Sequence, residues 1–175
     1  MEGRLTDRRI GYLKQIKMSD YKVSEHFVLQ EFINPDDFEE SKENSIDLID
    51  HRLIDIAEFT RKDLGKPVTI NNWHTGGKYK ESGLRDPNTK TGSKKSAHKA
   101  GKAIDVKAKG FGGKEWYDWV KKNAKKLYDL GLRRIEDKKI ATTWCHMDTK
   151  EHGEPNVIQI VDLTIITERI KIIGL

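Results

Sequence analysis

The sequence predicts an α+β fold in which helices pack on a small, mostly antiparallel sheet. Three observations support this prediction. Apolar residues recur at helical spacing over residues 45–64 and 114–130. Residues 102–108 alternate between apolar and polar with the period of a strand. Residues 132–136 and 142–148 are strand-like and enclose a short polar run, which is typical of an antiparallel hairpin.

The length and composition are those of one folded domain with short extensions. A chain of 175 residues, 35% of them apolar and 35% charged, can bury a core, and it lacks the composition of disordered or collagen-like chains. We expect the domain to span residues 24–155, after an N-terminal extension over 1–23. Residues 156–175 are rich in Val and Ile. They should form a C-terminal extension that supplies either an added strand or an assembly surface through which the chain could oligomerise.

The first half of the domain is expected to contain an aromatic segment, a helix and a strand. Residues 24–32 mix Phe side chains with polar residues and stop at Asn34-Pro35, as a short packed segment would. The first helical run ends at Gly65, a residue type that commonly terminates helices. Residues 68–72 then form a short strand, because β-branched residues dominate them.

A long loop separates this strand from the next one. Residues 74–96 contain turn-forming residues throughout, and a loop of this length in a compact domain is expected to be functional or disordered. The strand 102–108 that follows places Asp105 on one face and Ile104 and Val106 on the other.

The second half should consist of a helix and a hairpin. The helical run after residue 113 is expected to end at Gly131. In the second strand of the hairpin, Trp144, His146 and Asp148 share one face, while Cys145 points the other way. Cys145 is therefore expected to be a core thiol rather than a metal ligand.

Several features are excluded by what the sequence lacks. Its longest nearly apolar stretch, residues 157–166, is much shorter than the roughly 20 residues that a membrane helix needs, so no membrane span is expected. The N-terminus has charges but no apolar core of a secretory signal, so we expect synthesis for the cytosol. A single Cys permits neither an internal disulfide nor a multi-cysteine zinc site. A bound metal would have to use His and carboxylate groups.

The positive charge is concentrated in the middle of the chain. The net charge is +5, but residues 24–63 carry four bases and twelve acids, whereas residues 64–126 carry sixteen bases and five acids. A basic region suggests nucleic acid, an anionic surface or an anionic polymer as partner. A solvated Lys-rich surface would give the same pattern.

One constellation carries recognisable metal chemistry. His98 lies in a loop, Gly101 allows a tight turn, and Asp105 follows on a strand, so an imidazole and a carboxylate can approach one metal ion. His146 would complete the site from the hairpin. Two imidazoles and one carboxylate leave the fourth position of a tetrahedral zinc ion open for water, as in catalytic zinc sites. Three further histidines lie in segments that do not suggest ligation: His26, His51 and His152.

Two patterns resemble a known family. Ser-x-His-x-x-Gly-x-Ala-x-Asp at 96–105 and Trp-x-His-x-Asp at 144–148 are similar to motifs of the zinc D-Ala-D-Ala carboxypeptidases and related phage peptidoglycan endopeptidases, which are peptidase M15-like. The resemblance covers roughly residues 24–150, including Gly83-Leu84-Arg85. It implies a hedgehog/DD-peptidase-like fold and one Zn2+ ion as cofactor.

The resemblance also implies roles for individual residues. By position, His98, Asp105 and His146 would bind zinc. Arg85 would contact the substrate carbonyl or carboxylate as charge develops, a role that suits a forked donor that stays charged. The remaining substrate contacts are expected from the first residue of the 96–105 motif and from the start of the long loop: Ser96 and His74. For His74, packing or substrate contact is favoured over metal ligation.

The sequence departs from the family at the catalytic base. The carboxypeptidases have a Glu three residues before the last His, and this chain has Thr143 there. Glu136 is the first candidate, because the hairpin would place it beside the second strand. Asp148 is the second, because it shares the face of His146, although it could instead orient an imidazole. Asp137 is a distant third.

The implied function is that of an endolysin-like or D,D-carboxypeptidase-like zinc metallopeptidase. It would hydrolyse an amide bond in the stem peptide of bacterial peptidoglycan, acting at the cell wall after release or carried in a bacteriophage virion. Lys side chains around the first motif would concentrate such a hydrolase on the anionic cell wall. Which bond is cut depends on the shape of the long loop and is not decided by the sequence.

Two other functions compete with this one. The main alternative is a non-catalytic zinc-binding or phage structural module that keeps the fold and has lost the base, as Thr143 suggests. Binding to nucleic acid ranks third and is not expected. Trp116 and Trp119, the aromatic residues near the basic cluster, should be buried on a helix rather than stacked on bases.

Overall fold

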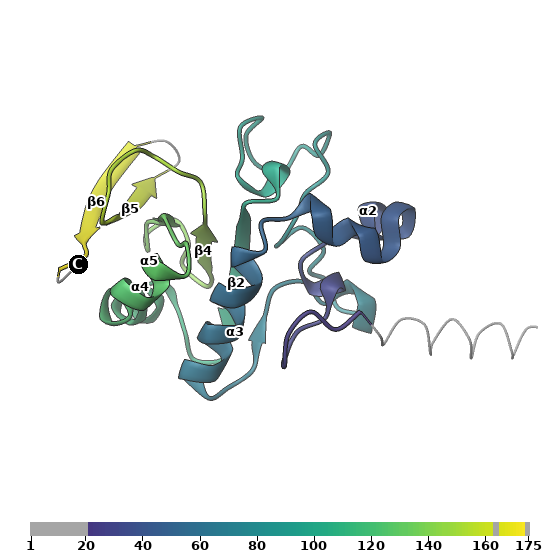
Figure 1. Cartoon of the computed structure of the whole chain (residues 1–175), viewed down its shortest axis with the longest axis horizontal. Helices are drawn as coiled ribbons and strands as arrows, with labels where there is room; N and C mark the ends of the chain where they lie inside the picture. The colour runs from purple at the N-terminus through teal and green to yellow at the C-terminus, as the bar shows by residue number, and fades with distance from the viewer. Residues whose placement is uncertain (1–20, 163–164, 174–175) are drawn as a thin grey trace, which may run out of the picture.

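The computed structural model describes residues 21–162 and 165–173, in which helices pack on one six-stranded sheet (Figure 1). The helices are α2 (Pro35–Ser41), α3 (Arg52–Leu64), α4 (Gly113–Lys122) and α5 (Ala124–Asp129), together with the 3-10 turns η1 (Leu29–Glu31), η2 (Lys42–Leu48), η3 (Trp73–Thr75) and η4 (His98–Ala100). The strands are β1 (Val68–Thr69), β2 (Ala103–Ala108), β3 (Arg134–Glu136), β4 (Cys145–Asp148), β5 (Val157–Asp162) and β6 (Ile165–Lys171). The expected α+β class is confirmed.

The sheet is mixed, and this corrects the expectation of a mostly antiparallel sheet. The strand order is β1-β2-β4-β3-β5-β6, and β3 pairs with β5 in parallel. The cause lies in the C-terminal segment. After β4 the chain reverses direction and crosses to the edge of β3 that β4 does not occupy. β5 therefore runs antiparallel to the direction of β4, which makes it parallel to β3. The predicted hairpin of β3 and β4 is antiparallel, as expected.

The residues that were expected to form a C-terminal extension belong to this sheet. β5 and β6 pair as an antiparallel hairpin, and β5 bonds to β3. The extension therefore supplies two added strands. Figure 1 shows the β5–β6 hairpin at the end of the molecule opposite α2. Most of the expected N-terminal extension, residues 1–20, lies outside the described residues.

The core lies between one face of the sheet and the helices. α3 contacts β2, α4 contacts β4 and α5 contacts β5. The strand residues that point toward them are fully or almost fully buried: Ile104, Val106, Ile135, Cys145, Met147, Ile158 and Ile160. Trp116 and Trp119 of α4 are buried in the same cluster, as expected. The opposite face carries polar side chains on β2 and β4, among them Asp105 and His146.

Several helix and strand boundaries differ from the prediction. The helix expected from residue 45 begins at Arg52, because η2 and an extended Ile49 precede it. The helix expected over 114–130 is broken at Asn123 into α4 and α5. The strand expected over 68–72 is only two residues long. Both glycines expected to end helices, Gly65 and Gly131, have positive φ.

A helix that was not predicted begins at Pro35. Asn34 has extended backbone angles, and its side chain accepts a hydrogen bond from the backbone N–H of Asp37. Proline is favoured in the first turn of a helix because no intrahelical partner is needed for its nitrogen there. The Asn-Pro pair therefore starts α2 instead of only ending the aromatic segment. Within residues 21–162 and 165–173, no helix is long and apolar enough to cross a membrane.

Gly101 is the turn that connects η4 to β2. Its φ is +64°, and its carbonyl oxygen accepts a hydrogen bond from Asp50 N–H at 2.8 Å. A Cβ atom at this position would lie 1.9 Å from the carbonyl oxygen of Leu48. Both the backbone angle and the close approach therefore require glycine, as expected from the sequence.

We predict that Gly101→Ala destabilises the protein far more than Gly110→Ala. Gly110 also has positive φ, at +82°, but nothing lies within 4 Å of a Cβ built on it. The control should lose about 1 kcal/mol from the left-handed backbone alone. The Gly101 variant should lose clearly more free energy of unfolding, because the backbone of Leu48 must also move. Denaturant unfolding of both variants measures this, and equal losses would contradict the close packing of this turn.

Candidate metal centre

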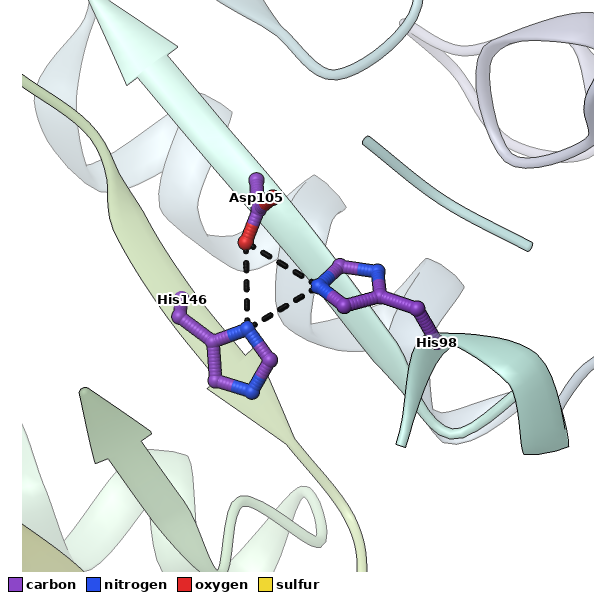
Figure 2. A group of neighbouring side chains, drawn as sticks. All are labelled: His98, Asp105 and His146. Carbon is purple, nitrogen blue, oxygen red and sulfur yellow. Dashed lines mark hydrogen bonds and ion pairs between the residues drawn. The ribbon is translucent and has the colours of Figure 1, made fainter. Parts of the chain in front are cut away.

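Three side chains that were singled out in the sequence meet at one point of the structure (Figure 2). His98 Nε2 lies 3.2 Å from Asp105 Oδ1 and 3.0 Å from His146 Nδ1. His146 Nδ1 lies 3.0 Å from the same Asp105 oxygen. The three atoms thus form a small triangle whose members come from η4, β2 and β4.

Strand pairing brings the two distant halves of the triangle together. β2 and β4 are antiparallel, and Asp105 is paired directly with His146. Directly paired residues point to the same face of a sheet. The neighbours Ile104 and Met147 point into the core on the other face, so the polar pair is held on the face that the helices leave free.

The long loop after η3 positions the third side chain. His98 is only 2% exposed, and its Nδ1 lies 2.9 Å from the carbonyl oxygen of Gly83. A carbonyl oxygen can only accept a hydrogen bond, so Nδ1 of His98 must carry the ring proton. The lone pair of Nε2 then faces Asp105. Gly83 itself packs against the backbone of Phe32, where a Cβ atom would lie 2.1 Å from the carbonyl oxygen of Phe32.

The ring of His146 is oriented by a second carboxylate. Its Nε2 lies 3.2 Å from Asp148 Oδ2, so it donates to Asp148 and leaves Nδ1 for the triangle. Asp148 is 1% exposed and is held by Arg134, with contacts of 2.8, 3.0 and 3.1 Å. Such carboxylate–imidazole pairs commonly orient metal-binding histidines.

The three atoms fit a divalent metal ion. Metal–ligand distances near 2.0–2.1 Å in a tetrahedral zinc site put neighbouring ligand atoms about 3.3 Å apart. The observed separations of 3.0–3.2 Å are close to this value. Each imidazole also has its outer nitrogen occupied by an acceptor. The donor set of two imidazoles and one carboxylate suits zinc and other first-row transition metals.

The electrostatics of the triangle favour a cation. Burial alone would raise the pKa of Asp105, but His98 and His146 beside it hold that pKa well below its usual range. Burial lowers the pKa of His98 and keeps its imidazole neutral. Burial acts the same way on His146, but its contacts with Asp105 and Asp148 outweigh it and raise the pKa of His146 to about 10. With this pKa, His146 keeps a proton at neutral pH, shared with Asp105. A metal ion between His146 and Asp105 would take the place of that proton.

Glu136 lies next to the triangle. The β3–β4 register pairs Ile135 with Met147, so the next residue of β3, Glu136, lies beside His146. Burial raises the pKa of Glu136. Unlike that of Asp148, its carboxylate makes no hydrogen bond within the part of the chain that the structure describes.

The triangle opens into a cleft of about 460 Å³. Two of the expected substrate contacts, Arg85 and Ser96, line it. Arg85 donates from Nη2 to Asp105 Oδ2 at 3.0 Å and from Nε to the carbonyl of Glu81 at 2.7 Å. The lining also includes residues that the sequence did not single out as site residues: Lys95, Arg134, Ile140, Lys150 and Val161.

The remaining candidates lie apart from the triangle. His74, for which packing or substrate contact was expected, is not among the residues that line the cleft, and its ring packs edge-on against Trp73. Asp137 bonds to Thr167 instead of facing the cleft. Cys145 is 4% exposed and belongs to the core, as expected.

A second group of ligand-type atoms lies near the start of the described chain. Glu25, His26 and Glu58 come within 4.8 Å of one another. Lys62 already pairs with both carboxylates, at 2.7 and 3.2 Å. Because a lysine supplies the positive charge, this group is an ion-pair network that ties the aromatic segment to α3.

The ion pair of Arg134 with Asp148 was not predicted from the sequence. It precedes Glu136 by two residues, so strand alternation puts both on one face. The register of the hairpin pairs Arg134 with Asp148. The alternation of side chains along the strand could be seen in the sequence. The register that places Arg134 opposite Asp148, and so lets them form an ion pair, could not.

Comparison of the chain with protein-family models, with curated proteins and with solved structures found no match.

We predict that the purified protein binds one divalent transition-metal ion at the triangle. Titration calorimetry with Zn2+ should show one tight site in the wild type and none in His98→Ala or His146→Ala. Asp148→Asn should weaken binding by about 10–100-fold, because the outer nitrogen of His146 loses its charged acceptor. The exposed Asp129→Asn is the matched control and should bind like the wild type. Wild-type affinity in the two His variants would rule out this site.

Proposed function

We propose that this chain is a zinc-dependent peptidase that hydrolyses an amide bond in the peptide part of bacterial peptidoglycan. The observation that carries the proposal is the triangle of two imidazoles and one carboxylate, which lines a cleft together with Arg85 and with Glu136, whose carboxylate makes no hydrogen bond in the described chain. These are the parts that metal-assisted amide hydrolysis needs. The choice of peptidoglycan, and of a hedgehog/DD-peptidase-like fold, rests on the resemblance of the motifs at 96–105 and 144–148.

The metal would be held by His98, Asp105 and His146. When bound, zinc supplies Lewis acidity, which makes a water molecule more acidic and a carbonyl more electrophilic. The chain's own residues keep the two imidazoles aimed at one point through Gly83 and Asp148.

Glu136 is the proposed general base. Its carboxylate has no competing hydrogen bond in the described chain, lies beside His146 in the sheet, and lines the cleft. The raised pKa brings it closer to neutral pH, where a group can both accept and return a proton. It would take a proton from the attacking water and pass it to the leaving amine.

Asp148 is a poorer base and a better orienting group. Both of its oxygens are engaged by Arg134, and one of them also accepts from His146. Burial tends to raise its pKa, but the contacts with His146 and Arg134 lower it overall. A carboxylate that is already bonded and whose pKa is lowered cannot readily take a proton from water.

Arg85 would stabilise the negative charge that develops on the substrate oxygen. A guanidinium has five N–H donors, and the contacts to Asp105 and Glu81 use two of them. The others remain for a carbonyl or carboxylate in the cleft. Holding the guanidinium by two contacts fixes it before the substrate arrives, which makes the stabilisation more effective.

The charges at the cleft suit an anionic peptide. Lys95 and Lys150 lie along its lining, and stem peptides carry free carboxylates. We infer that the protein acts at the cell wall, after release from the cell or as part of a virion. Binding to nucleic acid has less support, because Trp116 and Trp119 are 1% and 7% exposed and offer no surface for stacking on bases.

The alternative function is a non-catalytic zinc-binding or phage structural module of the same fold. One observation favours it: Thr143, at the position of the family's catalytic Glu, is exposed and carries no carboxylate. The two proposals differ in whether Glu136 takes over that role.

We predict that Glu136→Gln lowers hydrolysis by about 10²–10⁴-fold while zinc affinity stays unchanged, because only the proton acceptor is lost. The measurement is the release of new amino groups from purified cell walls. Glu168→Gln, an exposed change on the same sheet, is the control and should retain full activity.

Two outcomes would count against the proposal in different ways. Full activity in Glu136→Gln would show that another group is the base. A wild type that binds zinc but releases no amino groups would favour the non-catalytic module.

A further inference from the structure

One wall of the cleft is a loop that has few bonds to the rest of the chain. Residues 86–95, here called the wall loop, connect Arg85 to the segment that carries His98, and three of them line the cleft: Gly92, Ser93 and Lys95. Within the described residues, the backbone-to-backbone hydrogen bonds of the wall loop reach no further than Ser96. The position of this wall therefore depends on side chains from outside the loop.

Two charged side chains supply that support. Lys99 donates from Nζ to the carbonyl oxygens of Pro87 at 3.1 Å and of Thr89 at 2.7 Å. The carboxylate of Glu81 accepts a hydrogen bond from Thr91 Oγ1 at 2.8 Å. Hydrogen bonds to charged groups are stronger than those between neutral groups. A cation thus holds the first half of the wall loop, and an anion holds its middle.

Both side chains come from segments that also hold the metal centre. Lys99 directly follows the ligand His98 in η4. The carbonyl oxygen of Glu81 accepts the hydrogen bond from Arg85 Nε at 2.7 Å. The wall loop itself packs close to the same arginine, because a Cβ atom built on Gly92 would lie 3.0 Å from Arg85 Nη1. The wall loop is therefore tied to the same segments as the metal ligands and Arg85.

The contacts of the wall loop are not part of the buried core. Pro87 and Thr91 are exposed, and Thr89 is half-buried. If the ammonium group of Lys99 were removed, water could bond to the carbonyl oxygens that it leaves. Little free energy of unfolding should then be lost. The loss should appear instead as local freedom of the loop.

We propose that Lys99 and Glu81 are positioning residues for the substrate, because they fix the wall loop beside the metal centre. This inference rests on the proposed peptidase function and deepens it by naming the side chains that preform one wall of the cleft. A loop that is already in place does not have to be ordered by the substrate, so the substrate binds more tightly. Neither side chain lines the cleft, so KM should depend on them much more than kcat.

The first measurement is the rate at which trypsin cuts the folded protein within the wall loop. The loop contains Lys90, Lys94 and Lys95 as cleavage sites, and mass spectrometry identifies the products. Lys99→Met should be cut there about tenfold faster than the wild type, because cleavage follows the population of molecules in which the loop is released. Its free energy of unfolding should stay nearly unchanged. Lys99→Arg should restore slow cleavage, because a guanidinium can also donate to two carbonyls.

Lys102→Met is the matched control. It removes the same charge at an exposed position just before β2, and the side chain of Lys102 has no hydrogen bond or ion pair within the part of the chain that the structure describes. Thr91→Val is a second test variant, because it removes only the hydroxyl group that donates to Glu81, at an exposed position. It should be cut about threefold faster than the wild type.

The second measurement is the hydrolysis of soluble synthetic stem peptides. Lys99→Met should raise KM about five- to tenfold and change kcat by less than about twofold, because only the fraction of molecules with the loop in place binds substrate well. The affinity for Zn2+ should stay at the wild-type value, since all three ligands are retained. Lys102→Met should match the wild type in KM, kcat and metal affinity.

The outcomes separate this inference from the proposed function. If Lys99→Met and Thr91→Val are cut no faster than Lys102→Met, the inference is refuted and the peptidase proposal stands. Faster cutting with an unchanged KM would refute the role in substrate binding. If Lys99→Met does not fold, Thr91→Val decides. If the wild type binds zinc and hydrolyses no peptide, the peptidase proposal and the substrate role both fail, while the trypsin rates still decide whether Lys99 and Glu81 hold the loop.

Discussion

The antiparallel pairing of β2 with β4 is the interaction on which the site depends. It places Asp105 directly opposite His146, although the two are 41 positions apart in the sequence. A slip of one residue in this register would turn Asp105 toward the helices and Ile104 toward the cleft. The core prevents such a slip, because Ile104 and Met147 are fully buried on the other face. Hydrophobic packing on one side of the sheet thus sets the geometry of the polar cluster on the other.

The same pairing explains which parts of the site could be predicted from the sequence. Alternation within each strand put Asp105 and His146 on the polar face, and the turn chemistry of Gly101 explained how His98 returns to them. These features are local, so they can be recognised in a short stretch of sequence. The hairpin of β3 and β4 was predicted for the same reason, and it places Glu136 next to His146.

The features that escaped prediction depend on contacts between distant segments. The ion pair of Arg134 with Asp148 follows from the register between two strands. The parallel pairing of β5 with β3, which makes the sheet mixed, depends on where the chain goes after β4. No local pattern encodes that path, so the contribution of Val161 to the cleft was not visible either. The helix α2 was missed for another reason, since Asn-Pro is compatible with both the end of a segment and the start of a helix.

The central claim is that His98, Asp105 and His146 are the ligands of one zinc ion. A crystal structure of the zinc-loaded protein, with anomalous scattering measured at the zinc absorption edge, tests it most directly. The account predicts one strong peak about 2.0–2.2 Å from His98 Nε2, from His146 Nδ1 and from an Asp105 oxygen, with Glu136 beside it in the cleft. A peak at Glu25, His26 and Glu58 instead, or no peak between the three proposed ligands, would contradict it.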